Sequence, residues 1–118
     1  MISIGSPSYK EETLVPIYKY KKISDDTSGT EVTIWTPSSG KQIVLISSII
    51  SVDSVGTVEL KDQTSGDTIA VLEFEAIKSV PFAPGFQILL PKDHALSAKF
   101  TVNTGTGNCY ITIFGYER

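Results

Sequence analysis

The chain is poor in the residues that build redox and metal sites. Its 118 residues include one cysteine, Cys109, and one histidine, His94. A single cysteine excludes a disulfide within the chain and a thiolate metal cluster. Because Cys109 lies in an alternating apolar segment, we expect it to be a small buried hydrophobe.

Long apolar runs and an excess of basic charge are also missing. The longest apolar segment, residues 43–50, is interrupted by two serines, whereas a membrane-spanning helix needs about 20 apolar residues. Residues 1–7 (M-I-S-I-G-S-P) lack the basic start and apolar core of a signal peptide. The net charge of −3 provides no basic field for nucleic acid. The sequence therefore predicts a protein made in a reducing cytoplasm, with neither a membrane nor a nucleic acid as partner.

What the chain has in quantity is short alternating segments separated by turns rich in Ser, Gly, Thr, Asp and Pro. In residues 30–35, for example, Val32 and Ile34 alternate with Glu31 and Thr33, which is typical of a strand with one buried face. No segment shows a convincing helical pattern. The predicted strands are residues 14–23, 30–35, 42–52, 58–61, 68–75, 86–90, 96–102 and 107–118.

Eight strands at this spacing predict an all-β fold, an antiparallel eight-stranded β-sandwich. Two four-stranded sheets would make it jelly-roll-like, and an immunoglobulin-like sandwich is the second possibility. Prolines limit strand pairing: Pro16 indicates an edge strand or a bulge, while Pro81 and Pro84 should interrupt pairing over residues 81–85. Residues 1–12 show no period and read as a short N-terminal arm, and residues 13–118 form the single domain.

Candidate catalytic groups are sparse. His94 directly follows Asp93, and adjacent residues do not orient one another as the members of a catalytic triad do. We therefore interpret His94 as a solvated loop histidine.

We interpret the candidate acidic residues as parts of turns or as ordinary residues on a sheet surface. Asp25 with Asp26, and Asp62 with Asp67, lack the ligand spacing of a calcium loop. Glu73 and Glu75 read as sheet-face residues and not as the acid pair of a glycosidase. We expect no enzyme activity, with no catalytic residue, no metal and no cofactor.

The final strand carries apolar side chains on both faces. Tyr110, Phe114 and Tyr116 share one face, while the other carries Cys109 and two isoleucines. In a two-layer sandwich the second sheet covers only one face of each strand, so the aromatic face needs another cover.

Three covers for this face remain open: the N-terminal arm, a second subunit, or a ligand. In the last case Trp35 would join the aromatic residues in a platform that stacks on sugars. We expect the second possibility, a subunit interface through Tyr110, Phe114 and Tyr116, and hence a homo-oligomer.

From Trp35 onward the chain has a characteristic order of features. W-T-P-S-S-G-K precedes an Ile/Val/Leu strand, followed by G-T-V-E-L-K-D-Q-T-S-G-D-T-I-A, V-P-F-A-P-G-F, H-A-L-S-A-K-F-T and Y-I-T-I-F-G-Y-E. Over roughly residues 30–118 this order resembles the small β-sandwich virion proteins of tailed bacteriophages. Those proteins decorate or cement the outer capsid, or are minor head or tail components.

The resemblance implies a non-enzymatic capsid decoration or cement protein, assembled in the host cytoplasm and located in the virion. It implies a homo-oligomer, with a trimer expected, seated on the major capsid protein. The capsid contacts would come from an arm that includes Ile2, Ile4, Tyr9 and Leu14. The alternative is a carbohydrate- or receptor-binding β-sandwich module of a phage tail or fibre.

A first prediction concerns the arm. Deleting residues 1–12 should abolish binding to the assembled shell and leave the sandwich folded, because the arm lies outside the domain. Co-sedimentation with shells, together with circular dichroism, measures both effects. Undiminished binding of the truncated chain would rule out the arm as the shell contact.

Overall fold

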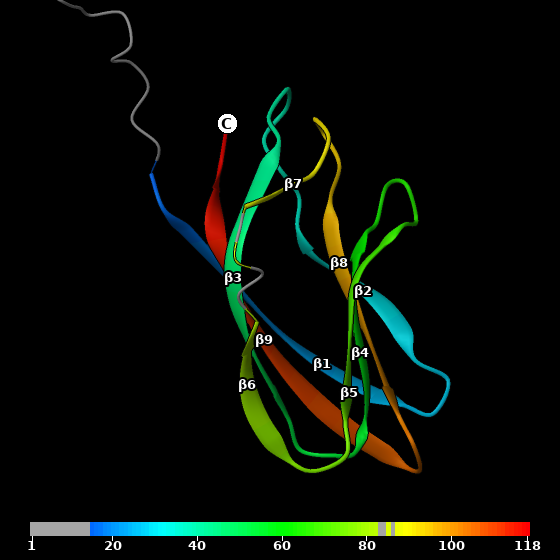
Figure 1. Cartoon of the computed structure of the whole chain (residues 1–118). Helices are drawn as coiled ribbons and strands as arrows, with labels where there is room; N and C mark the ends of the chain where they lie inside the picture. Colours follow the sequence, from blue (N-terminus) through cyan, green and yellow to red (C-terminus); the bar gives the residue numbers. More distant parts are fainter. Residues whose placement is uncertain (1–14, 83–84, 86) are drawn as a thin grey trace, which may run out of the picture.

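Alternating apolar and polar residues build a structure of strands. The computed structural model describes residues 15–82, 85 and 87–118, and in this part of the chain it has nine strands and no helix (Figure 1). No helix that could cross a membrane is found among the described residues. The strands are β1 (Ile17–Asp26), β2 (Thr30–Trp35), β3 (Ile43–Val52), β4 (Gly56–Asp62), β5 (Thr68–Phe74), β6 (Lys78–Phe82), β7 (Ile88–Leu89), β8 (Leu96–Val102) and β9 (Thr106–Glu117).

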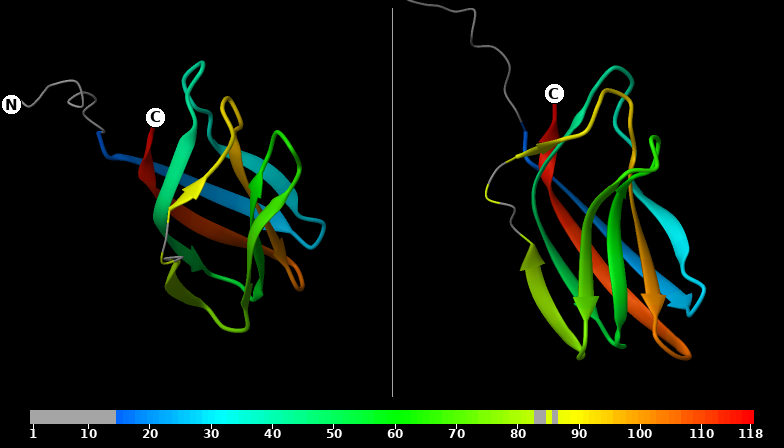
Figure 2. Two further views of the ribbon diagram at one scale, coloured as in Figure 1. Left: turned by 45° about the horizontal axis from the view of Figure 1, so that its top comes forward. Right: turned by 45° about the vertical axis from the view of Figure 1, so that its right-hand side comes forward.

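The strands form two antiparallel sheets that pack face to face (Figure 2). The first sheet has the order β1-β9-β3-β6, with β7 also pairing with β3, and the second has the order β2-β8-β4-β5. The pairs β1–β9, β2–β8, β3–β6 and β4–β5 are nested: the outermost joins the first strand to the last and the innermost joins two consecutive strands, like one long hairpin folded across both sheets. The predicted β-sandwich is confirmed, and its nested pairing is that of a jelly roll rather than of an immunoglobulin-like sandwich.

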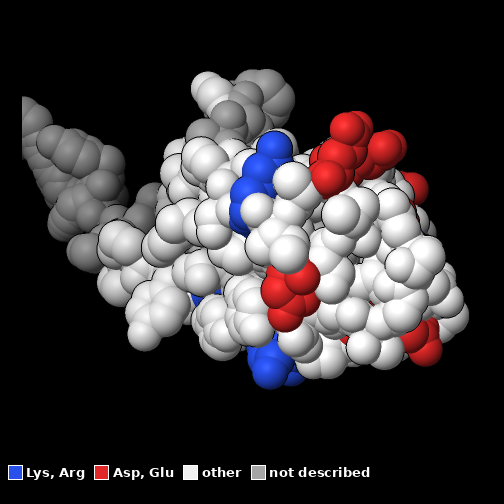
Figure 3. Space-filling model, turned by 90° about the horizontal axis from the view of Figure 1, so that it is seen from below, with Lys and Arg blue, Asp and Glu red and all other residues white. Residues whose placement is uncertain are grey.

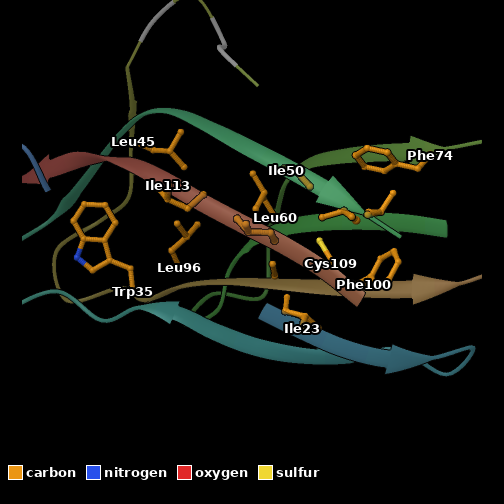
Figure 4. Packing of buried hydrophobic residues seen from close by; sticks show 14 of the residues in the cluster. Ile23, Trp35, Leu45, Ile50, Leu60, Phe74, Leu96, Phe100, Cys109 and Ile113 are labelled. Atoms are coloured by element: carbon orange, nitrogen blue, oxygen red, sulfur yellow. The ribbon is translucent and has the colours of Figure 1, made fainter. Parts of the chain in front are cut away.

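The core lies between the two sheets. The first sheet contributes residues such as Leu45, Ile50 and Ile113, and the second contributes Leu60 and Phe100, all completely buried (Figure 4). Cys109 is also completely buried among them, as predicted. Burial of these apolar side chains is the main free-energy gain that offsets the ordering of the chain.

The prediction failed at the strand that completes the first sheet. Pro81 was expected to interrupt pairing, yet it lies within β6 and stands opposite Ile49 of β3. A proline is tolerated there because β6 is an edge strand, which needs to donate hydrogen bonds on one side only. The predicted strand 86–90 shrinks to the two residues of β7.

A bulge shapes the outer side of the first sheet. The pairing of β3 with β9 shifts by one residue between Leu45 and Ser47, and the extra residue, Ile46, is exposed. Gly115 of β9 lies opposite the bulge, where a Cβ atom would collide with the carbonyl oxygen of Val44. The close approach of the two backbones at this point therefore requires glycine.

The core supplies a stability prediction. Phe100→Ala should lower the free energy of unfolding by about 3–5 kcal/mol, because it removes a completely buried ring and leaves a cavity. Thr101→Ala, next along β8 on the outer face, should change it by about 0.5 kcal/mol or less. Urea denaturation measures both; similar losses for the two variants would contradict the assignment of inner and outer faces.

Candidate functional site

The outer surface of the first sheet collects aromatic side chains from two neighbouring strands. On β9, Phe114 and Tyr116 point away from the core, since the alternate residues of that strand are completely buried. On β1, Tyr18 pairs with Phe114, and Tyr20 pairs with Thr112 of β9. Strand pairing therefore brings four aromatic residues to one surface.

Two isoleucines of β3 extend this surface on the other side of β9. Ile49 pairs with Thr112, and Ile46 stands out at the bulge. We call the combined surface the aromatic face, and its members are Tyr18, Tyr20, Ile46, Ile49, Phe114 and Tyr116. The side chains are unusually open for their type, with Tyr18 71% exposed, Tyr20 56% and Ile49 47%.

A groove of about 310 Å³ crosses the aromatic face. Its walls are almost entirely apolar, and one wall is Ile46, which the bulge turns outward. The groove is lined by Pro16, Ile17, Tyr18, Ile46, Phe114, Gly115 and Tyr116. A cleft of this size and character suits apolar side chains of a protein partner.

The outer surface of the second sheet is polar. The Nζ atom of Lys99 lies 3.5 Å from Oε2 of Glu59, and the Ser97 hydroxyl donates a hydrogen bond to Oε2 of Glu31. Such a surface is stable in water, as expected for a sandwich with one wet face per sheet. The two outer surfaces therefore differ, and the aromatic face is the one that lacks a cover among the described residues.

The three predicted interface residues lie in two different places on this surface. Phe114 and Tyr116 both line the groove. Tyr110 lies on the same side of β9 but further along it, opposite Lys22 and Ser51, with the Nζ atom of Lys22 5.9 Å from its ring centroid. The surroundings of Tyr110 are thus polar, in contrast to those of the other two aromatics.

The predicted arm contacts Ile2, Ile4, Tyr9 and Leu14 lie outside the residues that the structure describes. Tyr18, Tyr20 and Ile46 were missed by the sequence analysis. The alternation of tyrosines with lysines in residues 18–22 was a usable signal for the first two, whereas nothing in the sequence indicates the bulge at Ile46.

The proposed sugar platform with Trp35 is wrong. Trp35 is 1% exposed and closes one end of the core (Figure 4). Its Nε1 atom donates a hydrogen bond of 2.9 Å to Oε2 of Glu117, whose other oxygen accepts one from the amide of Ser38. Burial alone would raise the pKa of Glu117, but these hydrogen bonds favour the charged form and leave the pKa below its ordinary value.

His94 is not a solvated loop histidine either. Its Nδ1 atom lies 2.9 Å from Oδ2 of Asp62, and the Asp62 side chain is only 9% exposed. Oδ1 of Asp62 also accepts a hydrogen bond from the amide of Ser65. The pair therefore joins the turn after β4 to the loop before β8, and among the described residues no serine hydroxyl or cysteine thiol completes a triad with His94.

Acidic side chains accept hydrogen bonds from the backbone of the turns: Oδ1 of Asp26 accepts one of 2.9 Å from the amide of Ser28. Ser24, Asp25, Asp26 and Asp53 line an open polar hollow of about 550 Å³, at the end of the sandwich where β1 ends and β9 begins. Asp53 accepts hydrogen bonds from the amide and the Nδ2 atom of Asn108, 2.6 and 2.8 Å long, which lower its pKa.

Acidic side chains at this end form separate small groups and not one continuous negative patch (Figure 3). Among the described residues, no three His, Cys, Asp or Glu side chains converge so that they could hold a metal ion.

Comparison with known proteins supports the fold but does not assign the chain to a family. No family model matches the chain, and no curated protein matches it. A solved structure from Bacillus endospore appendages, described as a novel family of disulfide-linked pili, aligns over 98% of both chains, with a TM-score of 0.52 and 13% identity. A virus-like particle of the extra small virus of the prawn Macrobrachium rosenbergii aligns over 94% of this chain and 86% of that one, with a TM-score of 0.32 and 14% identity. At 13% identity, the likeness to the endospore appendage protein concerns the fold and not the function.

The His94–Asp62 pair yields a prediction on pH. Burial raises the pKa of Asp62, but the hydrogen bonds from His94 and Ser65 outweigh this effect and the net pKa is lowered below 3.8. A carboxyl group with a depressed pKa stabilises the fold fully above its unfolded pKa, and this stabilisation is lost as the pH falls through the folded pKa. Asp62→Asn should therefore cost about 1–3 kcal/mol at pH 7 and less at pH 3.

Urea denaturation at the two pH values measures the difference. Asp67→Asn, an exposed carboxylate in the same turn, is the matched control and should leave the pH dependence of the native chain in place. An equal cost of Asp62→Asn at both pH values would contradict a stabilising role of the charged carboxylate.

Proposed function

We propose that this chain is a non-enzymatic structural protein that works in a multi-copy assembly, and that its copies associate through the aromatic face. The observation that carries the proposal is the contrast between the two outer surfaces. One is an ordinary polar sheet face, and the other exposes Tyr18, Tyr20, Ile46, Ile49 and Phe114 around an apolar groove.

Physical chemistry favours a protein cover for this surface. Apolar area removed from water contributes about 25 cal/mol per Å², and a contiguous apolar surface of this kind marks an interaction site in soluble proteins. Tyrosine is enriched at the centres of such interfaces because its ring gives a large contact area while its hydroxyl still finds a polar partner. A second copy of the chain offers the same groove and the same rings.

Contacts between copies would be non-covalent. Cys109, the single cysteine, is completely buried, and burial raises the pKa of its thiol to about 12. A thiol that is neither exposed nor ionised does not form disulfides readily. In this respect the chain differs from the endospore appendage protein of similar fold, which belongs to disulfide-linked pili.

Within this class, the specific role that we propose is capsid decoration or cement in a virion. The sequence resemblance to phage virion proteins supports it, and the jelly roll is a recurrent fold of capsid proteins. A homo-oligomer, with a trimer expected, would bind the major capsid protein. Binding only to the assembled shell would stabilise that shell by mass action.

A carbohydrate- or receptor-binding module is the second candidate. The exposed rings of Tyr18 and Tyr20 favour it, because aromatic faces stack on sugars. The groove argues against it, since its walls lack the convergent polar groups that orient small ligands. A glycan array separates the two functions; tryptophan fluorescence does not, because Trp35 is buried.

The interface prediction follows from the groove. Replacing both Phe114 and Tyr116 with Ser should turn the native oligomer into a species of lower mass, because the change removes two apolar walls of the groove. Light scattering across a concentration series measures the mass, and circular dichroism checks that the sandwich remains folded.

Ile77→Ser is the matched control, since Ile77 is 69% exposed in the turn between β5 and β6 and lies off the aromatic face. It should keep the native mass. If the double variant also keeps the native mass, the aromatic face is not the contact between copies.

A further inference from the structure

Each sheet ends in two edge strands, and an edge strand presents unpaired N–H and C=O groups on which another strand can add. The first sheet ends in β1 on one side and in β6 and the two-residue β7 on the other, and the second sheet ends in β2 and β5. Proteins protect such edges with lysines, prolines, bulges or short strands. The four edges of this molecule differ sharply in that protection.

Three of the edges are protected. β1 carries three lysines, and Lys19 points inward, with its Nζ atom 6.0 Å from the centroid of the Trp35 ring. β6 is five residues long and contains Pro81, which has no amide hydrogen to donate. β2 is six residues long, has an irregular register between Thr33 and Trp35, and lies against β1 of the other sheet, which covers it.

The edge of β5 has none of these devices apart from an irregularity at its start. Its seven residues, T-I-A-V-L-E-F, include no Lys, Arg, Pro or Gly, and Glu73 is the single charge. High β-propensity, low charge and no proline are the features of segments that add readily to other strands. Among the described residues, its backbone hydrogen bonds go to β4, and none reaches the outer edge.

The side chains of β5 are also incompletely covered. Val71 points away from the core and is 53% exposed. On the inner side, Ile69 and Leu72 pack against the core but remain partly exposed at the open side of the sandwich. An added strand would cover these side chains and would satisfy the free backbone groups.

We propose that the β5 edge binds the β5 edge of a second copy, in an antiparallel pair about a two-fold axis that continues the second sheet from one copy into the other. β5 of the second copy is the expected partner, because the other three edges in the described part of the chain resist strand addition. A two-fold contact needs a self-complementary surface, and an antiparallel pair of identical strands provides one.

The sequence of β5 fits such a pair. With the axis at Val71, the two Val71 side chains lie side by side on the outer surface, and Ala70 of one copy faces Leu72 of the other. The two Glu73 residues lie at opposite ends of the pair. They are then about 14 Å apart along the strands, beyond the Debye length of about 8 Å at physiological ionic strength.

This contact is separate from the aromatic face and does not rest on the proposed function. A two-fold contact alone produces a closed dimer, whereas a second, different contact on the same subunit allows such dimers to join into a larger array. The aromatic face belongs to the first sheet and the β5 edge to the second. A subunit that uses both could therefore occupy an extended shell or filament.

The deciding variant is Val71→Lys. Residue 71 pairs with Glu59 of β4 on the outer surface, so a lysine there gains an opposite charge within its own subunit and should not disturb the fold. In the pair it would place two lysines side by side at the axis, where like charges repel. Val71→Thr preserves β-branching and is the conservative control, and Ile77→Lys adds the same charge away from the edge.

Each variant is made in the native chain and in the Phe114→Ser, Tyr116→Ser background, which isolates the β5 contact from the aromatic face. Light scattering across a concentration series gives the mass, and hydrogen exchange of residues 68–74 reports on the free edge. In the background chain, Val71→Thr and Ile77→Lys should retain twice the monomer mass at high concentration. Val71→Lys should halve that mass and speed exchange in β5 at least about tenfold.

Three results would overturn the proposal. The first is an unchanged mass and exchange rate in Val71→Lys. The second is a background chain that stays monomeric at every concentration with either control substitution. The third is loss of β5 protection when residues 1–14 are deleted while Val71 is intact, which would assign the edge to that segment of a second copy. If the aromatic-face prediction fails, the β5 proposal can still be tested, because Val71→Lys is also compared with Val71→Thr and Ile77→Lys in the native chain.

Discussion

The pairing of β3 with β9 is the contact on which the rest of the structure depends. Both strands carry apolar side chains on both faces, and they lie side by side in the first sheet. Their inner residues, such as Ile50 and Ile113, form much of the core. Their outer residues cannot be buried by the second sheet, so burying the core on one side leaves an apolar surface on the other.

Neighbouring residues and strands give the apolar outer surface of this pair its groove. The bulge in β3 turns Ile46 outward, and Gly115 keeps the facing backbone close. β1 then adds Tyr18 beside Phe114. Because β1 and β9 come from opposite ends of the described chain, the groove forms only when the sandwich is complete, which ties the candidate interaction surface to global folding.

Nested pairing also decides where the free edges lie. β5, near the middle of the chain, pairs with β4 and ends the second sheet, while β1 and β2 lie against each other at the opposite side of the sandwich. Most pairs join residues far apart in sequence, which raises the contact order and slows folding. An unprotected edge in a slowly folding β protein favours aggregation, and its retention in β5 is consistent with use of that edge in the assembled state.

Local alternation determined most of the strands. Residues 30–35 and 96–102 became β2 and β8 with the expected bounds, and Phe114 and Tyr116 lie on the expected face, because side chains alternate wherever a strand forms. Tertiary structure decided the rest. Pro81 is tolerated only because β6 is an edge strand. Trp35 is buried in the core with its N–H satisfied by Glu117, and His94 pairs with Asp62 and not with its neighbour Asp93. These outcomes depend on which distant strands pair and in which register, and a two-residue period says nothing about either.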